Sequence, residues 1–304
     1  MSTTFQRFWN SDLLWSWRHS PIAIIATLMT VILFLGALGA TWLAPFDPFD
    51  LASINLLDAL KPPAWSADGA WPYLLGTDSQ GRDLFSALLY GTRTSLLIGL
   101  ASVLLAMLAG IVLGLIAGYA GGRIDAFIMR VADVQLSFPA ILIALLIDGV
   151  ARAVFPMNMH DTIAFPVLIG AIALAGWPQY ARTVRGSTLV EKNREYVQAA
   201  KVIGVSSLRI MFSHVLPNVT GPVLILATVH LATAIITEAT LSFLGVGVPA
   251  TSPSLGTLIR IGNDFLFSGE WWITIFPGLM LVLLVLSVNL LGDWLRDALN
   301  PKLN

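Results

Sequence analysis

Stretches of 20 or more residues without a charged side chain recur along this chain of 304 residues. The run between Arg93 and Arg123 is 29 residues long, and residues 21–46 contain no charge either. A helix needs roughly 20 apolar residues to cross a bilayer. Charged residues make up 12% of the chain, about half of the fraction usual in soluble domains. The sequence therefore predicts an all-α membrane protein and argues against a water-soluble enzyme.

The apolar runs predict six transmembrane helices. The third is the weakest, because Asp148 and Arg152 interrupt it. These two residues lie four positions apart, where they can neutralise each other on a helix. An even number of spans puts both termini on the same side of the membrane. The six predicted spans are residues 21–46, 94–122, 138–154, 162–181, 219–248 and 271–292.

Three glycines in the second predicted span repeat every four residues: Gly110, Gly114 and Gly118. This spacing puts them on one face of a helix, where a neighbouring helix can approach the backbone closely. We therefore expect this face to pack tightly against another span.

Lys and Arg are distributed unequally between the connecting segments. If the amino terminus lies inside, the inside segments hold 12 of these residues and the outside segments hold 5. Cytoplasmic segments of membrane proteins retain such an excess. The sequence thus predicts cytoplasmic termini, with an amphipathic segment at 1–20 and a transmembrane domain at 21–304. That domain has a long outside loop at 45–93 and a cytoplasmic loop at 182–217.

The predicted cytoplasmic loop has the pattern of a helix, a turn and a second helix. Asn193 can cap the first helix, and Gly204 can end it in a left-handed conformation. Ser206 or Ser207 can cap a second helix that runs to Pro217. Four residues of the first helix share one face: Tyr196, Ala199, Ala200 and Ile203. This small-residue face suits docking into a groove, but a solvated hairpin that only connects two spans fits the periodicity equally well.

The residues of this loop resemble a known family. Glu195-Tyr196-Val197-Gln198-Ala199-Ala200, Gly204 and His214-Val215-Leu216-Pro217-Asn218 look like the EAA loop of permease subunits of binding-protein-dependent ABC importers. Further stretches resemble the dipeptide, oligopeptide and nickel branch of that family: Leu75-Gly76-Thr77-Asp78, Gly81-Arg82-Asp83, Tyr90-Gly91, Leu241-Ser242-Phe243-Leu244-Gly245, Gly292-Asp293 and Leu295-Arg296-Asp297-Ala298-Leu299. Within the branch, Pro62-Pro63-Ala64-Trp65 and Asn300-Pro301-Lys302-Leu303 are most similar to the second permease of dipeptide importers.

The resemblance implies a division of labour among several chains in a bacterial inner membrane. Two paralogous permeases form the pathway, two ATPase subunits bind ATP and Mg on the cytoplasmic side, and a periplasmic binding protein delivers the solute. The chain itself contains no G-x-x-x-x-G-K-[ST] loop to cradle phosphates. It is therefore expected to be non-catalytic and to hold no cofactor or metal of its own.

The resemblance also assigns roles to residues of the loop. Glu195 would pair with the ATPase surface, Ala199 and Ala200 would let the helix sit deep, and Gly204 would make the turn. Pro217 and Asn218 would link the loop to the fifth span. The full set of expected coupling residues is Glu195, Tyr196, Ala199, Ala200, Gly204, His214, Leu216, Pro217 and Asn218.

Four polar residues of the fifth span fall within about 140 degrees of helical arc: His230, Thr233, Thr237 and Glu238. Polar groups in a span face protein or water rather than lipid. The first three fit a solute pathway and a helix-packing role equally well, whereas packing is favoured for Glu238.

Other classes of protein fit less well. An ion-coupled secondary transporter is the main alternative, because such proteins place ionisable groups near the midplane. The four histidines are scattered, without a His-x-x-x-His or Gly-x-Ser-x-Gly motif, so a membrane hydrolase is disfavoured. The net charge of -1 gives no sign of nucleic-acid binding. The identity of the solute stays open.

Overall fold

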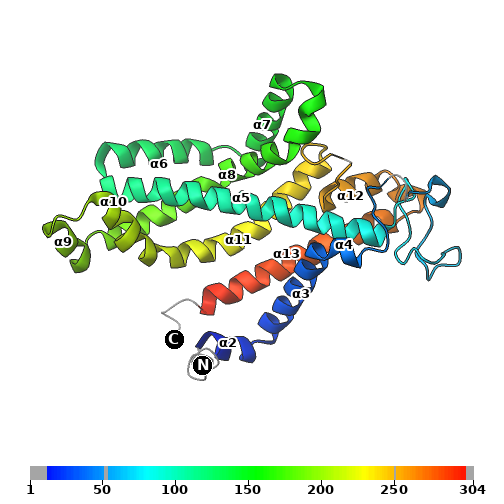
Figure 1. Ribbon diagram of the computed structural model, residues 1–304, viewed down its shortest axis with the longest axis horizontal. Coiled ribbons are helices and arrows are strands. Elements are labelled where there is room, and N and C mark those ends of the chain that lie inside the picture. The colour runs from blue at the N-terminus through cyan, green and yellow to red at the C-terminus, as the bar shows by residue number, and fades with distance from the viewer. Residues whose placement is uncertain (1–11, 51–53, 250, 299–304) are drawn as a thin grey trace.

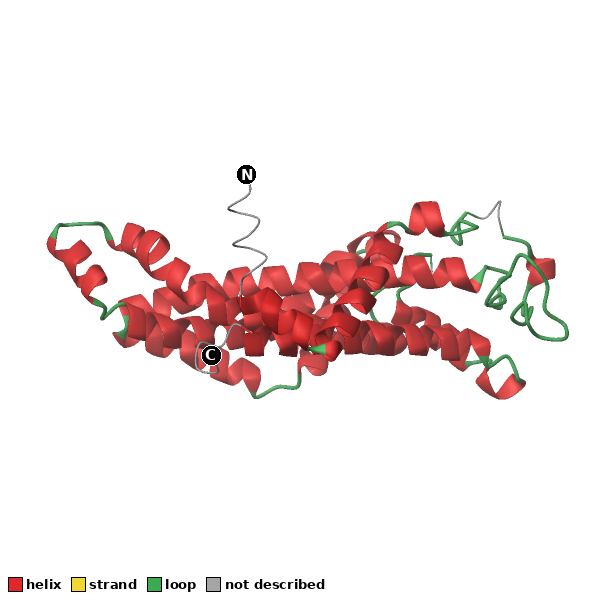
Figure 2. Ribbon diagram, turned by 90° about the horizontal axis from the view of Figure 1, so that it is seen from below, coloured by secondary structure: helices red, strands yellow, loops and turns green. Residues whose placement is uncertain are grey.

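The computed structural model describes residues 12–50, 54–249 and 251–298, and every extended regular element in these ranges is a helix. Figure 1 shows an elongated bundle, and Figure 2 shows that its loops gather at the two ends. The two ends of the chain, which are predicted to be cytoplasmic and contain Arg7 and Lys302, lie outside the described residues. Of the predicted amphipathic segment 1–20, the structure describes helix α2, Asp12–His19.

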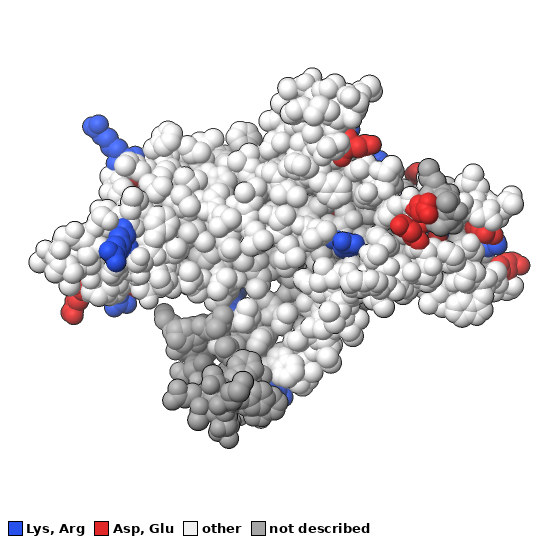
Figure 3. Space-filling model, in the orientation of Figure 1, with Lys and Arg blue, Asp and Glu red and all other residues white. Residues whose placement is uncertain are grey.

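Five helices are long and apolar enough to cross a membrane, which confirms the predicted all-α membrane fold. Figure 3 shows the charged atoms mainly near the two ends of the bundle, with a predominantly uncharged surface between them. The five are α3 (Pro21–Leu38), α5 (Leu84–Ala120), α8 (His160–Glu191), α11 (Leu216–Phe243) and α13 (Trp272–Ala298).

The third predicted span, residues 138–154, coincides with helix α7 (Ala140–Val154), which is short and follows a sharp bend. Helix α7 has 15 residues, a rise of about 22 Å, which is shorter than a bilayer core. It is bent by 91° from the preceding helix α6 (Gly122–Leu136). Pro139 caps α7 and disfavours helical backbone at the residue before it. Among the described residues, the structure therefore has five candidate spans, or six if the bent pair counts as one.

Helix α6 occupies a segment that the sequence analysis treated as a cytoplasmic connection. Its carboxylates pair with arginines of α8: Arg185 Nη2 donates to Asp125 Oδ2 over 2.6 Å, and Arg182 pairs with Asp133. Trp177 Nε1 also donates to Gln135 Oε1 over 2.8 Å. Because their partners lie on a helix 40 or more residues away, these ion pairs are invisible to sequence periodicity.

The glycine face of α5 packs against α8, as its spacing predicts. A Cβ added to Gly114 would lie 2.6 Å from Ala181 O, and one added to Gly118 would lie 2.7 Å from Thr188 Cβ. Lys192 Nζ donates to Gly118 O over 2.7 Å. Only bare backbone allows such an approach, and α5 and α8 share the most extensive helix contact among the described residues.

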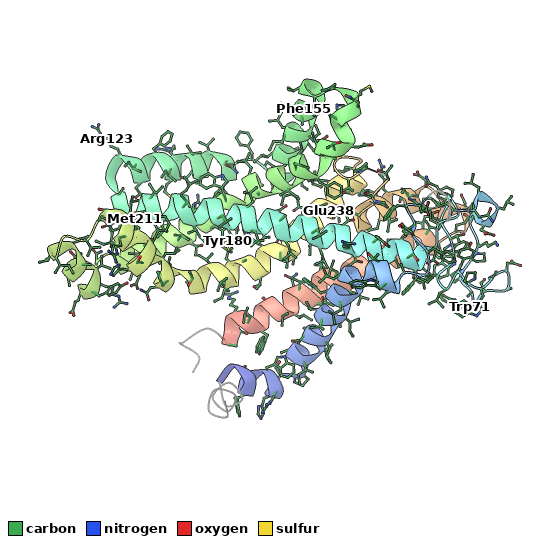
Figure 4. All side chains as sticks on the ribbon, viewed as in Figure 1. Trp71, Arg123, Phe155, Tyr180, Met211 and Glu238 are labelled. Carbon is green, nitrogen blue, oxygen red and sulfur yellow. The ribbon has the colours of Figure 1, made fainter. Side chains whose placement is uncertain are left out.

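The end of the bundle that holds the connection between α4 and α5 also contains α12, and Figure 4 places Trp71 there. Asp83 caps α5 by accepting from Ser86 N over 2.8 Å, and Arg82 Nε donates to Asp78 Oδ2 over 2.6 Å. Trp272 Nε1 donates to Thr77 O over 3.1 Å and ties this turn to α13. The elements at this end are α4 (Ala40–Leu43), η1 (Leu56–Asp58), α12 (Leu255–Asn263) and η4 (Leu266–Ser268).

The opposite end carries helix α9 (Glu195–Val202), followed by α10 (Ser207–Arg209) and the π-helical turn η3 (Ile210–Val215). Arg123 and Met211 lie toward this end in Figure 4. The 3-10 turn η2 (Met157–Met159) joins α7 to α8. We call residues 192–209 the α9 hairpin.

Candidate functional site

The α9 hairpin is shorter than the predicted loop 182–217, because the flanking helices continue into it. Helix α8 runs to Glu191, past Arg182, and residues 207–243 form one continuous helical stretch through Pro217. Pro217 lies in the first turn of α11, directly after the π-helical η3. Proline lacks an N–H, which is tolerated in a first turn. The second helix, predicted to end at Pro217, therefore continues into α11 without interruption.

The buried face of α9 differs from the face predicted from spacing. Val197 is fully buried and Ala200 is 4% exposed, and both pack on Ile210, Met211 and Val215 of the following segment. Ala199 is exposed, and Ile203 is 77% exposed. The four residues predicted to share a face thus split between a packed side and a free side.

Gly204 ends α9 as predicted, with φ of +81°. Gly204 N donates to Lys201 O over 3.1 Å, and Val205 N donates to Ala200 O over 3.0 Å, which is a Schellman motif. The predicted cap Asn193 is wrong: Arg194 is the capping residue, and Asn193 Nδ2 donates to Leu189 O over 3.0 Å instead. Ser206 precedes α10 but makes no side-chain capping bond.

Tyr196 ties the hairpin to the ends of both long helices. Its hydroxyl donates to Glu191 Oε2 of α8 over 2.6 Å and accepts from Asn218 Nδ2 of α11 over 2.9 Å. Asn218 Nδ2 also donates to His214 O over 2.8 Å. Burial raises the pKa of the Tyr196 hydroxyl, and its bond to Glu191 raises it further, so the hydroxyl stays a donor at neutral pH.

The free side of the hairpin is unusually apolar for an exposed tip. Val202, Ile203 and Leu208 are 87%, 77% and 68% exposed. Glu195 is exposed, and no hydrogen bond or ion pair to another described residue is recorded for it. The structure therefore presents apolar side chains and a carboxylate on a rigidly held hairpin, a combination typical of a protein interaction site.

A second candidate site is a hollow of about 90 Å³ between α5, α7, α8 and α11, which we call the polar hollow. Five small residues make room for it: Ala106, Ala140, Ala175, Gly176 and Ala234. Its polar side chains are Ser102, Gln179, His230, Thr233 and Thr237. Three of the four polar residues predicted to share a stripe on the fifth span thus lie together here.

The polar hollow is organised around His230. His230 Nε2 lies 2.5 Å from Gln179 Oε1 of α8, and the His230 ring meets the Tyr180 ring edge-on with centroids 4.8 Å apart. Thr233 and Thr237 donate their hydroxyls to Val229 O and Thr233 O, at 3.1 and 2.8 Å. These bonds leave the hydroxyl oxygens able to accept from a solute.

Glu238 does not line the polar hollow. It is fully buried, and its carboxylate accepts from Ser95 Oγ of α5 and Ser242 Oγ, each over 2.7 Å. Ser95 Oγ in turn accepts from Leu255 N at the start of α12 over 3.2 Å. Glu238 therefore belongs to a hydrogen-bond network that joins α5, α11 and α12.

Sequence reasoning missed Gln179 and Ser102. Both are uncharged polar residues inside apolar runs, and nothing in their spacing links them to the stripe on the fifth span. A search for any amide in a span would have found Gln179, because a polar group there requires a partner. Among the described residues, no cluster of three His, Asp or Glu is placed to hold a metal ion.

Comparison with known proteins identifies relatives over nearly the whole chain. The dipeptide transport system permease protein DppC of Haemophilus influenzae is 39% identical over 301 residues, which cover 99% of this chain and 96% of the relative. The di/tripeptide transport system permease protein DppC of Pseudomonas aeruginosa is 40% identical over 298 residues, covering 98% and 92%. The oligopeptide transport system permease protein OppC of Bacillus subtilis is 37% identical over 292 residues, covering 96% and 89%.

Solved structures support the same fold. Two inward-facing crystal forms of the MetNI methionine ABC transporter match with a TM-score of 0.55, covering 70% of this chain and 96% of theirs, at 18% and 19% identity. The family model of the binding-protein-dependent transport system inner membrane component matches residues 110–304. This chain therefore belongs to that family of membrane-embedded transport permeases.

Proposed function

We propose that this permease forms, together with a second and paralogous permease, the membrane pathway of an ATP-driven importer of dipeptides or other short peptides. The observation that carries the proposal is its similarity, at 39 to 40% identity and over 98 to 99% of the chain, to permeases named for dipeptide or di/tripeptide transport. A periplasmic binding protein would deliver the solute, and two ATPase subunits would bind ATP and Mg. The permease itself would be non-catalytic.

The α9 hairpin is proposed as the contact with an ATPase subunit. Its exposed apolar side chains, Val202, Ile203 and Leu208, would enter a cleft of the ATPase, and the free carboxylate of Glu195 would pair with the cleft's rim. Tyr196 would transmit movement of the ATPase subunit to the long helices of the permease, because its hydroxyl bonds to residues of both α8 and α11. His214, Leu216, Pro217 and Asn218 lie at the base of the hairpin and would keep it rigid with α11.

The hairpin end of the bundle is proposed to face the cytoplasm of a bacterial cell. The excess of Lys and Arg in the segments assigned to that side, 12 against 5, supports this orientation. Both chain termini would then be cytoplasmic, and the connection between α4 and α5 would face the periplasm and the binding protein.

The polar hollow is proposed as part of the solute route. His230, Thr233 and Thr237 line it, whereas Glu238 is buried in a packing network and is assigned no contact with the solute. No observation favours the ion-coupled alternative. Asp148, the acid within α7, is paired with Arg152, whose Nε donates to it over 2.6 Å.

Reconstitution of the complete complex in proteoliposomes tests this function. Uptake of labelled dialanine should require ATP in the lumen that represents the cytoplasm, the cognate binding protein outside, and an ATPase subunit able to hydrolyse ATP. Collapse of the proton and sodium gradients should leave uptake unchanged. Uptake that follows an ion gradient without ATP would instead establish a secondary transporter.

A further inference from the structure

The walls of the polar hollow contain no Asp, Glu, Lys or Arg. A solute that enters it meets only hydroxyl, amide and imidazole groups and small apolar side chains. A fixed charge of one sign would favour solutes of the opposite sign. The hollow therefore selects by hydrogen bonding, and it treats acidic and basic side chains of a solute alike.

Ser102 is part of the wall of the hollow but is fully buried. Its Oγ has almost no accessible surface and makes no hydrogen bond with a described residue. A solute in the hollow therefore cannot reach this hydroxyl, and the accessible amide and imidazole groups are those of Gln179 and His230.

The Gln179–His230 pair leaves one donor and one acceptor free. Gln179 Oε1 can only accept, so in the neutral ring His230 Nε2 carries the proton and Nδ1 is an acceptor. Nδ1 lies near Gly176, which is part of the wall of the polar hollow. A Cβ added to this glycine would lie 3.8 Å from Nδ1. No hydrogen bond among the described residues uses the amide Nε2 of Gln179, which can therefore donate.

We propose that Gln179 and His230 form a subsite for the main chain of a passing peptide. His230 Nδ1 accepts from the peptide N–H, and Gln179 Nε2 donates to a carbonyl or carboxylate oxygen. A peptide group presents one N–H donor and one carbonyl acceptor. These match the free acceptor of His230 and the free donor of Gln179. This assignment rests on the proposed function, and it explains how one route can pass peptides with different side chains.

The test compares dialanine with its ester analogue, in which an ester oxygen replaces the peptide N–H. Each is loaded to saturation on the binding protein, so that differences in capture do not enter, and initial uptake by the complete importer is measured. Wild-type importer should transport dialanine roughly five- to tenfold faster than the ester, the value of one hydrogen bond. The variant His230→Leu should lose this ratio, because it lacks the acceptor that distinguishes the two solutes.

One more variant tests the donor. Gln179→Leu should lower the uptake of both solutes several-fold, because both solutes keep their carbonyl oxygens. The control is Thr240→Val, which removes a polar group from α11, the helix of His230, but outside the hollow, where the Thr240 hydroxyl donates to Ile236 O over 2.8 Å. This variant should transport both solutes at wild-type rates.

The results separate the two proposals. If wild-type importer transports dialanine but does not distinguish it from the ester, or if His230→Leu distinguishes them as well as wild type, the subsite is wrong and the import function stands. If loaded binding protein, ATP and importer together transport no dialanine, both proposals are wrong.

Discussion

Gly110 of α5 lies against Tyr180 of α8 so closely that a Cβ on the glycine would be 2.3 Å from Tyr180 Cβ. The same added atom would lie 2.8 Å from Trp177 O. Both contacts are with atoms at or next to the backbone of α8. A side chain at position 110 would therefore fit only if the two helices moved apart. The ring of Tyr180 also meets His230 in the polar hollow. The spacing between α5 and α8 therefore also sets the position of His230.

The first prediction concerns this helix contact. Gly110→Ala should destabilise the complex by about 1 to 3 kcal/mol, the usual cost of overpacking. The apparent melting temperature of the purified complex measures it. The control is Gly170→Ala in α8, where an added Cβ meets no atom within 4 Å. That variant should be unchanged or more stable by up to about 1 kcal/mol, because alanine favours a helix. Equal melting temperatures for the two variants would contradict the close contact.

The second prediction concerns the buried carboxylate of Glu238. Glu238→Leu should cost about 1 to 3 kcal/mol for each buried hydroxyl left without a partner, whereas Glu238→Gln keeps an acceptor and should cost less. Because Ser95 also accepts from Leu255 N, the loss should appear at α12. Hydrogen exchange of the amides of Leu255–Asn263 measures it. Wild-type exchange there in Glu238→Leu would show that the network does not hold α12.

The sequence was sufficient for features that depend on local spacing. The glycine repeat of α5 marks its packing face, and the left-handed turn at Gly204 follows from the residue itself. The bent pair α6–α7 could not be predicted in the same way. Its first helix is amphipathic and carries charges, so hydropathy places it outside the membrane, and only the pairing of Asp125 and Asp133 with α8 explains its position.

The candidate sites show the same limit. Helical periodicity correctly grouped His230, Thr233 and Thr237, since all three lie on one helix. It included Glu238, which faces Ser95 on another helix, and it omitted Gln179, which meets His230 from α8. In α9, spacing predicted a common face for Ala199 and Ala200, but packing against η3 buries only Ala200. Contacts between helices decide such positions, and one helical pattern contains no information about them.

The third prediction concerns Tyr196. Tyr196→Phe removes the bonds to Glu191 and Asn218 while keeping the ring, at a cost of about 1 kcal/mol for each bond. The complex should still assemble, but ATP hydrolysis should be less tightly linked to uptake. The number of ATP molecules hydrolysed per dialanine imported measures this linkage. A wild-type ratio would mean that the hairpin does not need this anchor.

The fourth prediction concerns coupling through the hairpin. Gly204→Asp strains a backbone with φ of +81° and enlarges the tip, although no atom of the described residues lies within 4 Å of the added Cβ. Glu195→Ala removes an exposed carboxylate. Both should weaken copurification of the ATPase subunits or uncouple hydrolysis from uptake, with normal membrane insertion. Thr220→Val, on α11 outside the hairpin, is the control. Normal uptake by both variants would reduce the hairpin to a simple connection.

The last prediction concerns orientation. The chain has no cysteine, so single cysteines can be placed without a background. A cysteine at Lys192, in the α9 hairpin, should react with an impermeant maleimide only after the membrane is opened. Cysteines at Trp65 and Asp264 should react in intact spheroplasts.

Trp65 is 62% exposed and Asp264 is also exposed, so failure to label cannot be due to burial in this chain. The expected pattern follows from the 12 to 5 distribution of Lys and Arg. Labelling of position 192 from outside would reverse the orientation and remove the α9 hairpin from reach of any cytoplasmic ATPase.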